Sequence, residues 1–324
     1  GRVGALGVLA ALAQVAGSRR YVRPDLHTGF DLEIHQGRHP VVETMMPQEE
    51  FIPNDLTLDE ERRIVILTGP NMAGKSTVLR QVGLIQLLGQ VGAFVPAAAA
   101  RLPVCDRIFT RVGASDSLVR GQSTFMVEMN ETSAIVHGAT EESLILLDEI
   151  GRGTSTYDGV SIAWAVTEHL HEKVGAKTMF ATHYHELTQL GDLLPRVRNL
   201  NVSVREVGDD IVFLRRLEEG GADRSYGIQV ARLAGLPGEL LERARELLQE
   251  LEGTHSGGGI GLGRAGRHRP LSESSPDQLS LFGLEHPVVP RLRDLELEDM
   301  TPLEALNILA ALKELTLGKR KDDQ

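Results

Sequence analysis

Residues 69–77, with the sequence GPNMAGKST, constrain this chain more than any other feature. They match the pattern G-x-x-x-x-G-K-[ST], follow an apolar run and open a helical pattern over residues 77–90. Glycines let backbone N–H groups approach a phosphate closely, and the first turn of a helix adds positive potential. Strand, loop and helix in this order predict a phosphate-binding loop, and a ligand-free glycine turn is the alternative.

The predicted ATP contacts are the nine residues of this loop: Gly69, Pro70, Asn71, Met72, Ala73, Gly74, Lys75, Ser76 and Thr77. The amine of Lys75 is expected to contact the β- and γ-phosphates and to take part in catalysis. The hydroxyl of Ser76 is expected to bind Mg²⁺. ATP and Mg²⁺ are therefore the predicted ligands.

Two adjacent carboxylates end a second apolar run, Leu144-Ile-Leu-Leu-Asp148-Glu149. Beside a phosphate-binding loop such acids take distinct roles: Asp148 orients the Mg²⁺ shell, and Glu149 polarises the attacking water. Adjacent strand residues point to opposite faces, so the chain has to turn Glu149 into the site where the strand ends. Two solvated acids are the alternative.

Thr182-His183 ends a third apolar run, at a sheet edge where open α/β sheets bind ligands. We predict that His183 hydrogen-bonds the γ-phosphate and assists catalysis. A histidine alone is usually structural, so this prediction depends on the first two motifs. His185 is expected to be structural.

Two further loops with hydroxyl residues precede helical patterns. In GQSTF, residues 121–125, Ser123 or Thr124 is predicted to cap a helix, and the functional alternative is that this helix start faces the γ-phosphate of a second subunit. In GRGTSTYDG, residues 151–159, four side chains are placed to bridge two such sites: Arg152, Thr154, Ser155 and Asp158. Glycine-rich turns alone also explain this second loop.

Residues 31–182 alternate short apolar runs with helical patterns, which predicts βα units and parallel strands. The strand candidates are residues 63–68, 144–148 and 178–182. Their nearly continuous apolar character is expected for strands that helices cover on both faces. The predicted fold class is therefore α/β.

Composition restricts the kinds of protein to which this chain can belong. A chain of 324 residues with 41% hydrophobic residues can fill a substantial core. The single cysteine, Cys105, excludes an internal disulfide and fits a reducing cytoplasm, the predicted location. A formal net charge of -11 argues against a surface built to neutralise DNA phosphates. DNA contact is therefore expected to be local or to lie elsewhere.

Residues 3–17, VGALGVLAALAQVAG, lie between arginines and superficially resemble a signal peptide. The run is too short to span a bilayer. Its apolar residues recur at helical spacing, so a packed helix is preferred and no membrane association is expected: Leu9, Leu12, Ala13 and Ala16. Because the chain begins at Gly1, we expect that it starts inside a helix of a longer protein.

Residues 226–252 contain two helical patterns around Gly235 and Pro237, a helix-turn-helix by sequence. One face of the second is apolar: Leu240, Leu241, Ala244, Leu247, Leu248 and Leu251. The same pattern contains five acids that would repel DNA phosphates: Glu239, Glu242, Glu246, Glu250 and Glu252. Protein packing is therefore favoured over DNA reading.

Residues 253–277 are rich in glycine and poor in apolar residues, which predicts a flexible linker. Beyond it, Thr301-Pro302-Leu303-Glu304 has the pattern of a helix start with a capping box, and the helix is expected to reach about residue 315. Its apolar residues imply a partner surface: Leu303, Leu306, Leu309, Ala310, Leu312 and Leu315.

Four ordered segments, GPNMAGKST, FTRVGASDSLVRGQSTFMVEM, LLDEIGRGTSTYDG and FATHYHELTQL, resemble the ATPase domain of the MutS family of mismatch-repair proteins over residues 27–252. The resemblance implies a P-loop NTPase of the ABC type, with a mixed central sheet flanked by helices, that forms a homodimer. It further implies that Ser123 acts on the partner's ATP, that His183 is the switch histidine and that Phe51 of FIPND stacks on adenine. The helix-turn-helix would serve dimerisation.

The tail carries two finer resemblances. MTPLEALNILAALKEL is similar to the family's C-terminal segment that pairs dimers into tetramers. QLSLF, residues 278–282, resembles the peptide that bacterial repair proteins insert into the sliding clamp, with Gln278, Leu281 and Phe282 as the predicted contacts. Apolar anchors on a flexible arm suit pocket binding. A MutL-type partner is implied as well.

The family's mismatch-wedging Phe-x-Glu segment, connector, lever and clamp helices are absent from this chain, so mismatched DNA is expected to be contacted through missing N-terminal domains. The predicted organisation has five parts: an opening helix from a missing core domain (1–26), the ATPase domain (27–220), the helix-turn-helix (221–252), the linker with the clamp-binding-like peptide (253–285) and the C-terminal oligomerisation helix segment (286–324).

The predicted function is Mg²⁺-dependent hydrolysis of ATP to ADP and phosphate, which switches a DNA-bound dimer in the whole protein. One rival is the recombination-suppressing paralogue, which usually ends in a nuclease domain that this tail lacks. A second is a chromosome-organising ABC ATPase, but Lys75 and Asp148 are too close in sequence to flank its coiled coil. A third is an assembly module that binds ATP without hydrolysis, against which Glu149 argues.

Overall fold

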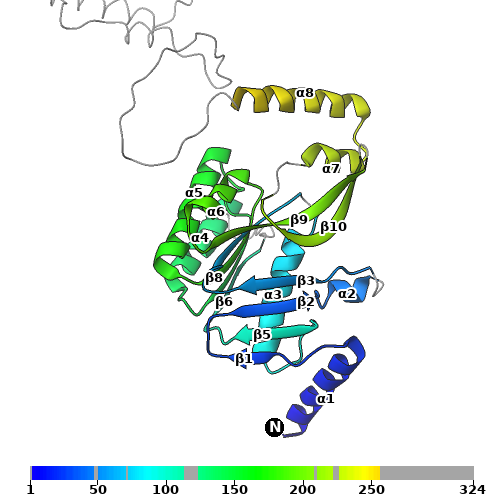
Figure 1. Ribbon diagram of the computed structural model, residues 1–324, viewed down its shortest axis with the longest axis vertical. Coiled ribbons are helices and arrows are strands. Elements are labelled where there is room, and N and C mark those ends of the chain that lie inside the picture. The colour runs from blue at the N-terminus through cyan, green and yellow to red at the C-terminus, as the bar shows by residue number, and fades with distance from the viewer. Residues whose placement is uncertain are drawn as a thin grey trace, which may run out of the picture. The chain divides into compact units, whose positions relative to one another are not determined.

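The computed structural model describes residues 2–46, 50–70, 72–112, 123–207, 210–221 and 226–255 (Figure 1). The chain divides into two compact units, Gly1–Gly258 and Gly259–Gln324, and all described residues lie in the first. Most of the predicted linker, the clamp-binding-like peptide with Gln278, Leu281 and Phe282, and the predicted tail helix lie outside the described residues.

The central sheet has six strands in the order β10-β9-β4-β8-β7-β6. In chain order these are β4 (Ile64–Thr68), β6 (Ile108–Arg111), β7 (Leu144–Asp148), β8 (Lys177–Ala181), β9 (Val197–Val207) and β10 (Asp210–Glu219). Five neighbouring strands are parallel, and β10 runs antiparallel to β9. The sheet is therefore mixed, and it contains all three strands predicted from apolar runs.

Helices cover both faces of this sheet, which is why its central strands are almost uniformly apolar. One face packs on α3 (Lys75–Gln90), and the other packs on α4 (Thr124–Gly138), α5 (Thr156–His169) and α6 (Leu190–Leu193) (Figure 1). A π-helical turn (Leu170–Val174) extends α5, and a 3-10 turn (His185–Gln189) leads into α6. Alternate residues of β4 enter different cores, Val65 with α3 and Ile66 with α4 and α5.

A second sheet, in the order β1-β5-β2-β3, shares the hydrophobic core of α3. Its strands are β1 (Asp25–His27), β2 (Leu32–Gly37), β3 (Asn54–Leu58) and β5 (Ala99–Pro103). Because β2 is antiparallel to both β3 and β5, the expectation of parallel βα units from residue 31 onward is wrong for this part. Leu32 and Ile34 are buried at alternate positions, the period-two pattern of a sheet with one covered face.

The opening segment forms α1 (Arg2–Arg19), so the predicted helix is confirmed. Val3, Leu6 and Leu9 are 87%, 69% and 62% exposed on the described part of this chain, so packing of this helix against a missing core domain stays a prediction. Helical spacing predicts a helix, but it does not say which surface covers the apolar side chains. Among the described residues, no helix is both long and apolar enough to cross a membrane.

The two helical patterns near residue 235 correspond to α7 (Gly227–Leu233) and α8 (Gly238–His255), and Gly235 turns between them with φ 83°. Within the predicted apolar face of α8, Leu241 is buried, while Leu240, Leu247 and Leu251 are exposed. The apolar face of α8 is therefore only partly buried on the described part of the molecule.

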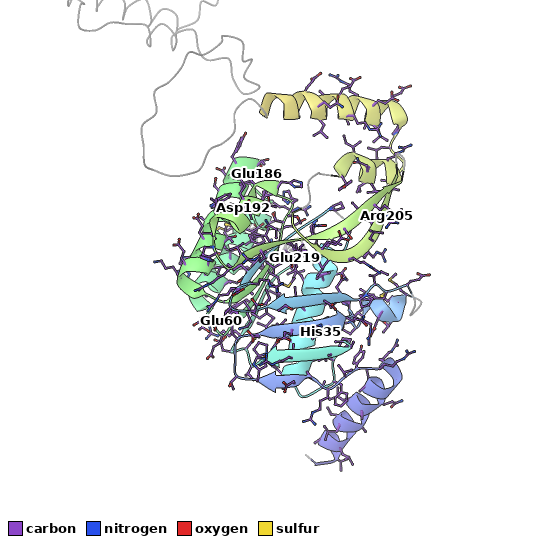
Figure 2. All side chains as sticks on the ribbon, in the orientation of Figure 1. His35, Glu60, Glu186, Asp192, Arg205 and Glu219 are labelled. Atoms are coloured by element: carbon purple, nitrogen blue, oxygen red, sulfur yellow. The ribbon has the colours of Figure 1, made fainter. Side chains whose placement is uncertain are left out.

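Acidic side chains lie on the outside of several elements, in keeping with the net charge of -11. Figure 2 labels Glu60, Glu186, Asp192 and Glu219, which come from four separate segments and are all exposed. Exposed carboxylates on several segments fit the expectation that this part of the chain does not neutralise DNA phosphates broadly.

Candidate nucleotide-binding site

Three neighbouring parallel strands bring the three predicted motifs to one edge of the central sheet. The register pairs Leu67 of β4 with Ala181 of β8, and Ala181 with Asp148 of β7. From these positions the chain continues into the predicted phosphate loop, into Thr182-His183 and into Glu149. Because parallel strands end at the same edge, the three motifs lie together at a position where α/β sheets bind ligands.

The loop between β4 and α3, the predicted phosphate loop, contains three residues with positive φ angles. Gly69, Met72 and Gly74 have positive φ angles of 131°, 73° and 111°, a region that glycine enters without steric cost. The helix starts at Lys75, slightly before its predicted start, and Gly74 provides no side chain to cap its first N–H groups. A bound anion would supply partners for those groups. Asn71 lies outside the described residues.

Lys75 is buried at the base of this loop, with 5% of its surface exposed. Its Nζ donates to the carbonyl oxygens of Gly69, at 2.5 Å, and Pro70, at 3.3 Å. Burial lowers the pKa of Lys75, while the charges of Glu149 and Asp148 act in the opposite direction. Both carboxylates therefore lie close enough to Lys75 to act on its charge.

Asp148 is buried at the end of β7, and its Oδ1 makes no hydrogen bond with any described residue. A buried carboxylate oxygen without a partner is unfavourable, so a cation or its water would stabilise this arrangement. Asp148 and the half-buried Ser76 provide oxygen ligands of the type that Mg²⁺ prefers. Since the described residues hold no group of three or more metal-binding side chains, Mg²⁺ here would also need nucleotide oxygens or water.

Glu149 leaves β7 through a turn that removes it from the strand alternation. Its φ is 59°, unusual for a non-glycine residue, and its N–H donates to the carbonyl of Ala181 at 2.9 Å. Its Oε2 forms an ion pair with Nε of Arg152 at 2.7 Å. The left-handed conformation thus supplies the change of direction that the sequence prediction required.

His183 lies beyond β8 with an exposed side chain, and its ring centroid is 4.1 Å from that of Tyr184. Partial burial lowers the pKa of His183; Glu149 raises it, and Arg152 and Lys75 lower it further. The imidazole therefore lies among the same charged residues that surround the phosphate loop.

A pocket of about 220 Å³ opens beside the phosphate loop and includes Phe51. The short helix α2 (Val42–Met45), the start of α3 and β10 contribute to its lining: Val42, Met46, Phe51, Ile52, Asn54, Met72, Ala73, Gly74, Thr77, Val78, Gln81 and Arg215. One aromatic ring, apolar groups and a few polar groups suit a planar heterocycle. Phe51 thus adjoins the loop, and its stacking on adenine stays a prediction.

Arg215 lines this pocket although no sequence pattern indicates it. It lies in β10 where the register with β9 shifts between Phe213 and Leu217, and its φ is 56°. Nδ2 of Asn54 donates to the carbonyl of Arg215, and Oδ1 of Asn54 accepts from the N–H of Leu217. A contact between residues so far apart in sequence becomes visible only in the folded chain.

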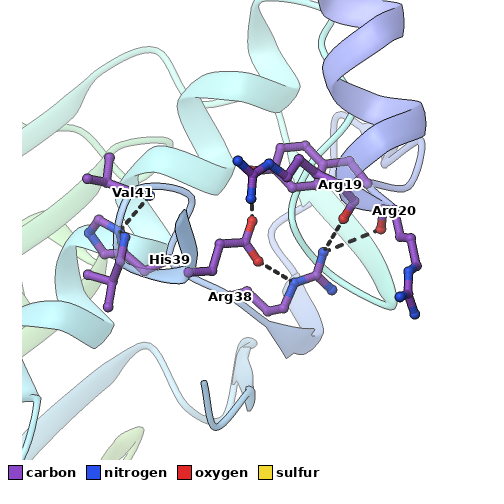
Figure 3. A network of polar contacts seen from close by, with 8 residues as sticks. Arg19, Arg20, Arg38, His39 and Val41 are labelled. Carbon is purple, nitrogen blue, oxygen red and sulfur yellow. Dashed lines mark hydrogen bonds and ion pairs between the residues drawn. The ribbon is translucent and has the colours of Figure 1, made fainter. Parts of the chain in front are cut away.

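A polar network joins the α2 wall of the pocket to the end of α1 (Figure 3). Arg38 donates from Nε to Glu43 at 2.7 Å and from Nη2 to the carbonyls of Arg19 and Arg20. The hydroxyl of Tyr21 donates to Glu43, and burial together with this bond raises the pKa of Tyr21 to about 12. The position of the pocket wall is therefore linked to the helix that precedes the sheets.

Ser123 is the N-cap of α4, so its predicted capping role is confirmed: Oγ accepts from the N–H of Met126 at 3.1 Å. Its side chain is exposed, and residues 113–122 before it lie outside the described residues. Ser155 caps α5 in the same way through the N–H of Asp158. The action of Ser123 on a partner's nucleotide, and a bridging role for the residues around Ser155, stay predictions.

Comparisons with known proteins agree with the resemblance. The profile described as MutS domain V matches residues 65–252. The DNA mismatch repair protein MutS of Anaeromyxobacter dehalogenans is 55% identical over 324 residues, covering 94% of this chain and 36% of that protein. Those of Syntrophobacter fumaroxidans and Nitratidesulfovibrio vulgaris are 54% and 53% identical, covering 99% and 96% of this chain and 37% and 36% of those proteins.

This chain therefore spans little more than a third of the length of these relatives. The matched profile covers more than half of the chain, and it includes the phosphate loop, the acidic pair and His183. On this evidence the chain belongs to the MutS family.

Proposed function

We propose that this chain binds ATP with Mg²⁺ and hydrolyses it to ADP and phosphate, as the ATPase part of a mismatch-repair protein. The observation that carries the proposal is the convergence of Lys75, Asp148, Glu149 and His183 at the ends of three adjacent strands. The names of the related proteins support the connection with mismatch repair.

Residues 69–77 hold the β- and γ-phosphates through backbone N–H groups and the first turn of α3. The amine of Lys75 is already desolvated and bound to the carbonyls of Gly69 and Pro70. Exchanging these neutral partners for phosphate oxygens strengthens its interactions, because hydrogen bonds between ions are the stronger class. Phe51 stacks on the adenine in the neighbouring pocket, and Arg215 lines the same pocket.

Ser76 and Asp148 hold Mg²⁺, which when bound neutralises charge on the phosphates. Glu149 orients and polarises a water molecule for in-line attack on the γ-phosphorus. To do so it has to leave Arg152, to which it is paired at 2.7 Å. His183 donates a hydrogen bond to the γ-phosphate.

The assembly proposals follow from exposed features and from the resemblance. Two chains pair through their ATPase faces, with Ser123 of each directed at the partner's γ-phosphate, and through the exposed leucines of α8. The C-terminal segment pairs dimers into tetramers, and residues 278–282 bind a sliding clamp. Contacts with mismatched DNA and a MutL-type protein belong to the whole protein.

A second candidate function is a nucleotide-gated assembly module without hydrolysis. The ion pair between Glu149 and Arg152 favours it, because a carboxylate that stays paired does not polarise water. The recombination-suppressing paralogue is a further alternative, distinguished by its biological role rather than by this site.

The decisive experiment replaces Glu149 with Gln. We expect the dissociation constant of ATP to change less than about twofold, and steady-state phosphate release to fall by about 100-fold or more, the range for loss of a general base. The matched control is Glu186→Gln, an exposed acid whose charge also acts on His183. Full turnover in Glu149→Gln would remove Glu149 from its role, and ATP binding without phosphate release in the unchanged protein would favour the assembly module.

A further inference from the structure

Gly151, two residues after Glu149, has both backbone polar groups bound by side chains of other elements. Its N–H donates to Oε1 of Glu128 in α4 through a short hydrogen bond. Its carbonyl accepts from the hydroxyl of Tyr184 at 2.8 Å. All three residues are buried, so the turn after Glu149 is held from two sides in a region of low dielectric.

The space around Gly151 is closed by close backbone packing. A Cβ on Gly151 would lie 2.6 Å from the Cα of Gly159 in α5, and one on Gly159 would lie 2.3 Å from the hydroxyl oxygen of Tyr184. A Cβ on Gly153 would lie 2.7 Å from that of Phe125 in the first turn of α4. Movement of α4 therefore has to move the 151–153 turn, because neither has room to slide past the other.

Glu128 has a cationic partner, and the Tyr184 hydroxyl keeps its proton. Arg111 at the end of β6 pairs with Glu128 at 3.2 Å, and their side chains are 5% and 4% exposed. This pairing compensates the buried charge of Glu128. Burial, with a contribution from Glu128, raises the pKa of Tyr184, so its hydroxyl stays protonated and available as a donor.

We propose that Glu128 and Tyr184 are positioning residues for hydrolysis: through Gly151 they hold the turn that presents Glu149. Glu128 belongs to the helix capped by Ser123, and Tyr184 directly follows His183. One cluster therefore connects the start of α4, the water-polarising acid and the histidine within the same chain. The inference rests on the proposed ATPase function.

A positioning role and a purely structural role have different kinetic signatures. Loss of structural contacts lowers stability and leaves the turnover of the folded protein unchanged. Loss of positioning lowers kcat in protein that is still folded, since small displacements of a catalytic group reduce the rate strongly. The affinity for ATP stays constant, because Glu128 and Tyr184 belong neither to residues 69–77 nor to the lining of the Phe51 pocket.

The first test compares Tyr184→Phe with Thr167→Val in the full-length protein. Each change removes one buried hydroxyl that donates to a backbone carbonyl; for Thr167 the acceptor is Ala163, at 2.8 Å. We expect Tyr184→Phe to lower kcat roughly tenfold with the ATP dissociation constant within about twofold. Thr167→Val is expected to keep kcat within about twofold of the unchanged protein.

The second test uses rescue at Glu128. Glu128→Gln keeps an oxygen that accepts the N–H of Gly151, whereas Glu128→Ala removes it, so the Gln variant is expected to retain more turnover. Thermal unfolding of each variant sets the assay temperature below its midpoint. Phosphate release and equilibrium binding of a fluorescent ATP analogue are the two readouts.

The outcomes separate this inference from the proposed function. Wild-type turnover in Tyr184→Phe while Glu149→Gln is inactive would overturn the positioning role and leave the ATPase standing. An equal loss of kcat in Tyr184→Phe and Thr167→Val would show that the cluster has a structural role only. An unchanged protein that binds ATP but releases no phosphate would overturn the ATPase and the positioning role together.

Discussion

At the scale of single residues, protein charges around the sheet edge determine which protonation states are available. His183 illustrates this, because partial burial and the cations Arg152 and Lys75 lower its pKa while Glu149 opposes them. The imidazole is therefore neutral around pH 7, with one nitrogen as donor and the other as acceptor. In the proposed function, a neutral ring would approach the nucleotide beside Lys75 and Mg²⁺ without adding a further positive charge.

This charge state leads to a prediction about pH. We expect kcat for ATP to stay constant from about pH 7 to 8 and to fall as His183 takes up a proton at pH values below the ordinary histidine pKa of about 6.5. Phosphate release measured against pH checks this, and His183→Gln should lose the acidic decline while His185→Gln keeps it. An identical decline in His183→Gln would show that another group titrates.

The direction in which pH changes the stability of the fold follows from the lowered pKa of His183. The folded state binds this proton more weakly than the unfolded state, so protonation of His183 destabilises the fold. The penalty is absent above the unfolded pKa of about 6.5 and grows as the pH falls below it. The difference between the unfolding midpoints of the unchanged protein and of His183→Gln should therefore stop changing with pH above about pH 7.

At the scale of elements, the N-terminal half of α4 combines two tasks. Its first turn is capped by the exposed Ser123, and Glu128 further along contacts Gly151. A helix that is rigid between these positions can pass a displacement at its start to the turn after Glu149. An experiment has to distinguish the helix-capping role of Ser123 from its proposed contact with a partner's phosphate.

Two substitutions of Ser123 achieve this separation. Asn and Asp both cap helices well, so Ser123→Asn and Ser123→Asp should change the free energy of unfolding by less than about 0.5 kcal/mol. Asp adds a negative charge that repels a γ-phosphate, so it alone should abolish ATP-dependent pairing and lower turnover at least tenfold. Sedimentation with ATP and Mg²⁺ and phosphate release are the measurements. Normal pairing of Ser123→Asp would contradict a phosphate at this helix start.

At the scale of the whole molecule, α8 and the tail provide separate candidates for assembly. Three leucines of α8, Leu240, Leu247 and Leu251, are exposed on the described part of the chain. The proposal for the tail beyond residue 255 rests on its sequence alone. Two surfaces of this kind predict two steps of association, an ATP-sensitive dimer and a tail-dependent tetramer.

Mass measurements in solution test the two steps. Removal of the residues after His255 should abolish tetramers and leave ATP-dependent dimers, whereas Leu247→Glu should weaken the dimer by placing a charge on an apolar contact. Glu242→Gln, elsewhere on α8, is the control. Tetramers without the tail would contradict its role, and unchanged dimers of Leu247→Glu would contradict the role of α8.

Local patterns predicted the elements that carry the chemistry. The apolar run of β7 was sufficient to predict this strand, because helices cover both of its faces. The loop at residues 69–77 could be predicted because its positive φ angles at Gly69 and Gly74 favour glycine. The four-stranded sheet escaped prediction because β2 and β3 are short and alternate with partly exposed residues. The pairing of Asn54 with the bulge at Arg215 spans 161 positions, and no local pattern contains it.

Local sequence patterns were enough to identify the predicted phosphate loop, the acidic strand end and the histidine strand end, because those conformations depend on neighbouring residues. Tertiary packing alone placed β8 between β4 and β7, an order unlike that of the chain, so that the three ends meet. It also decided that Glu128 and Tyr184 meet at Gly151. Such contacts arise from the packing of whole helices and strands, which minimises free energy over the molecule rather than within any one segment.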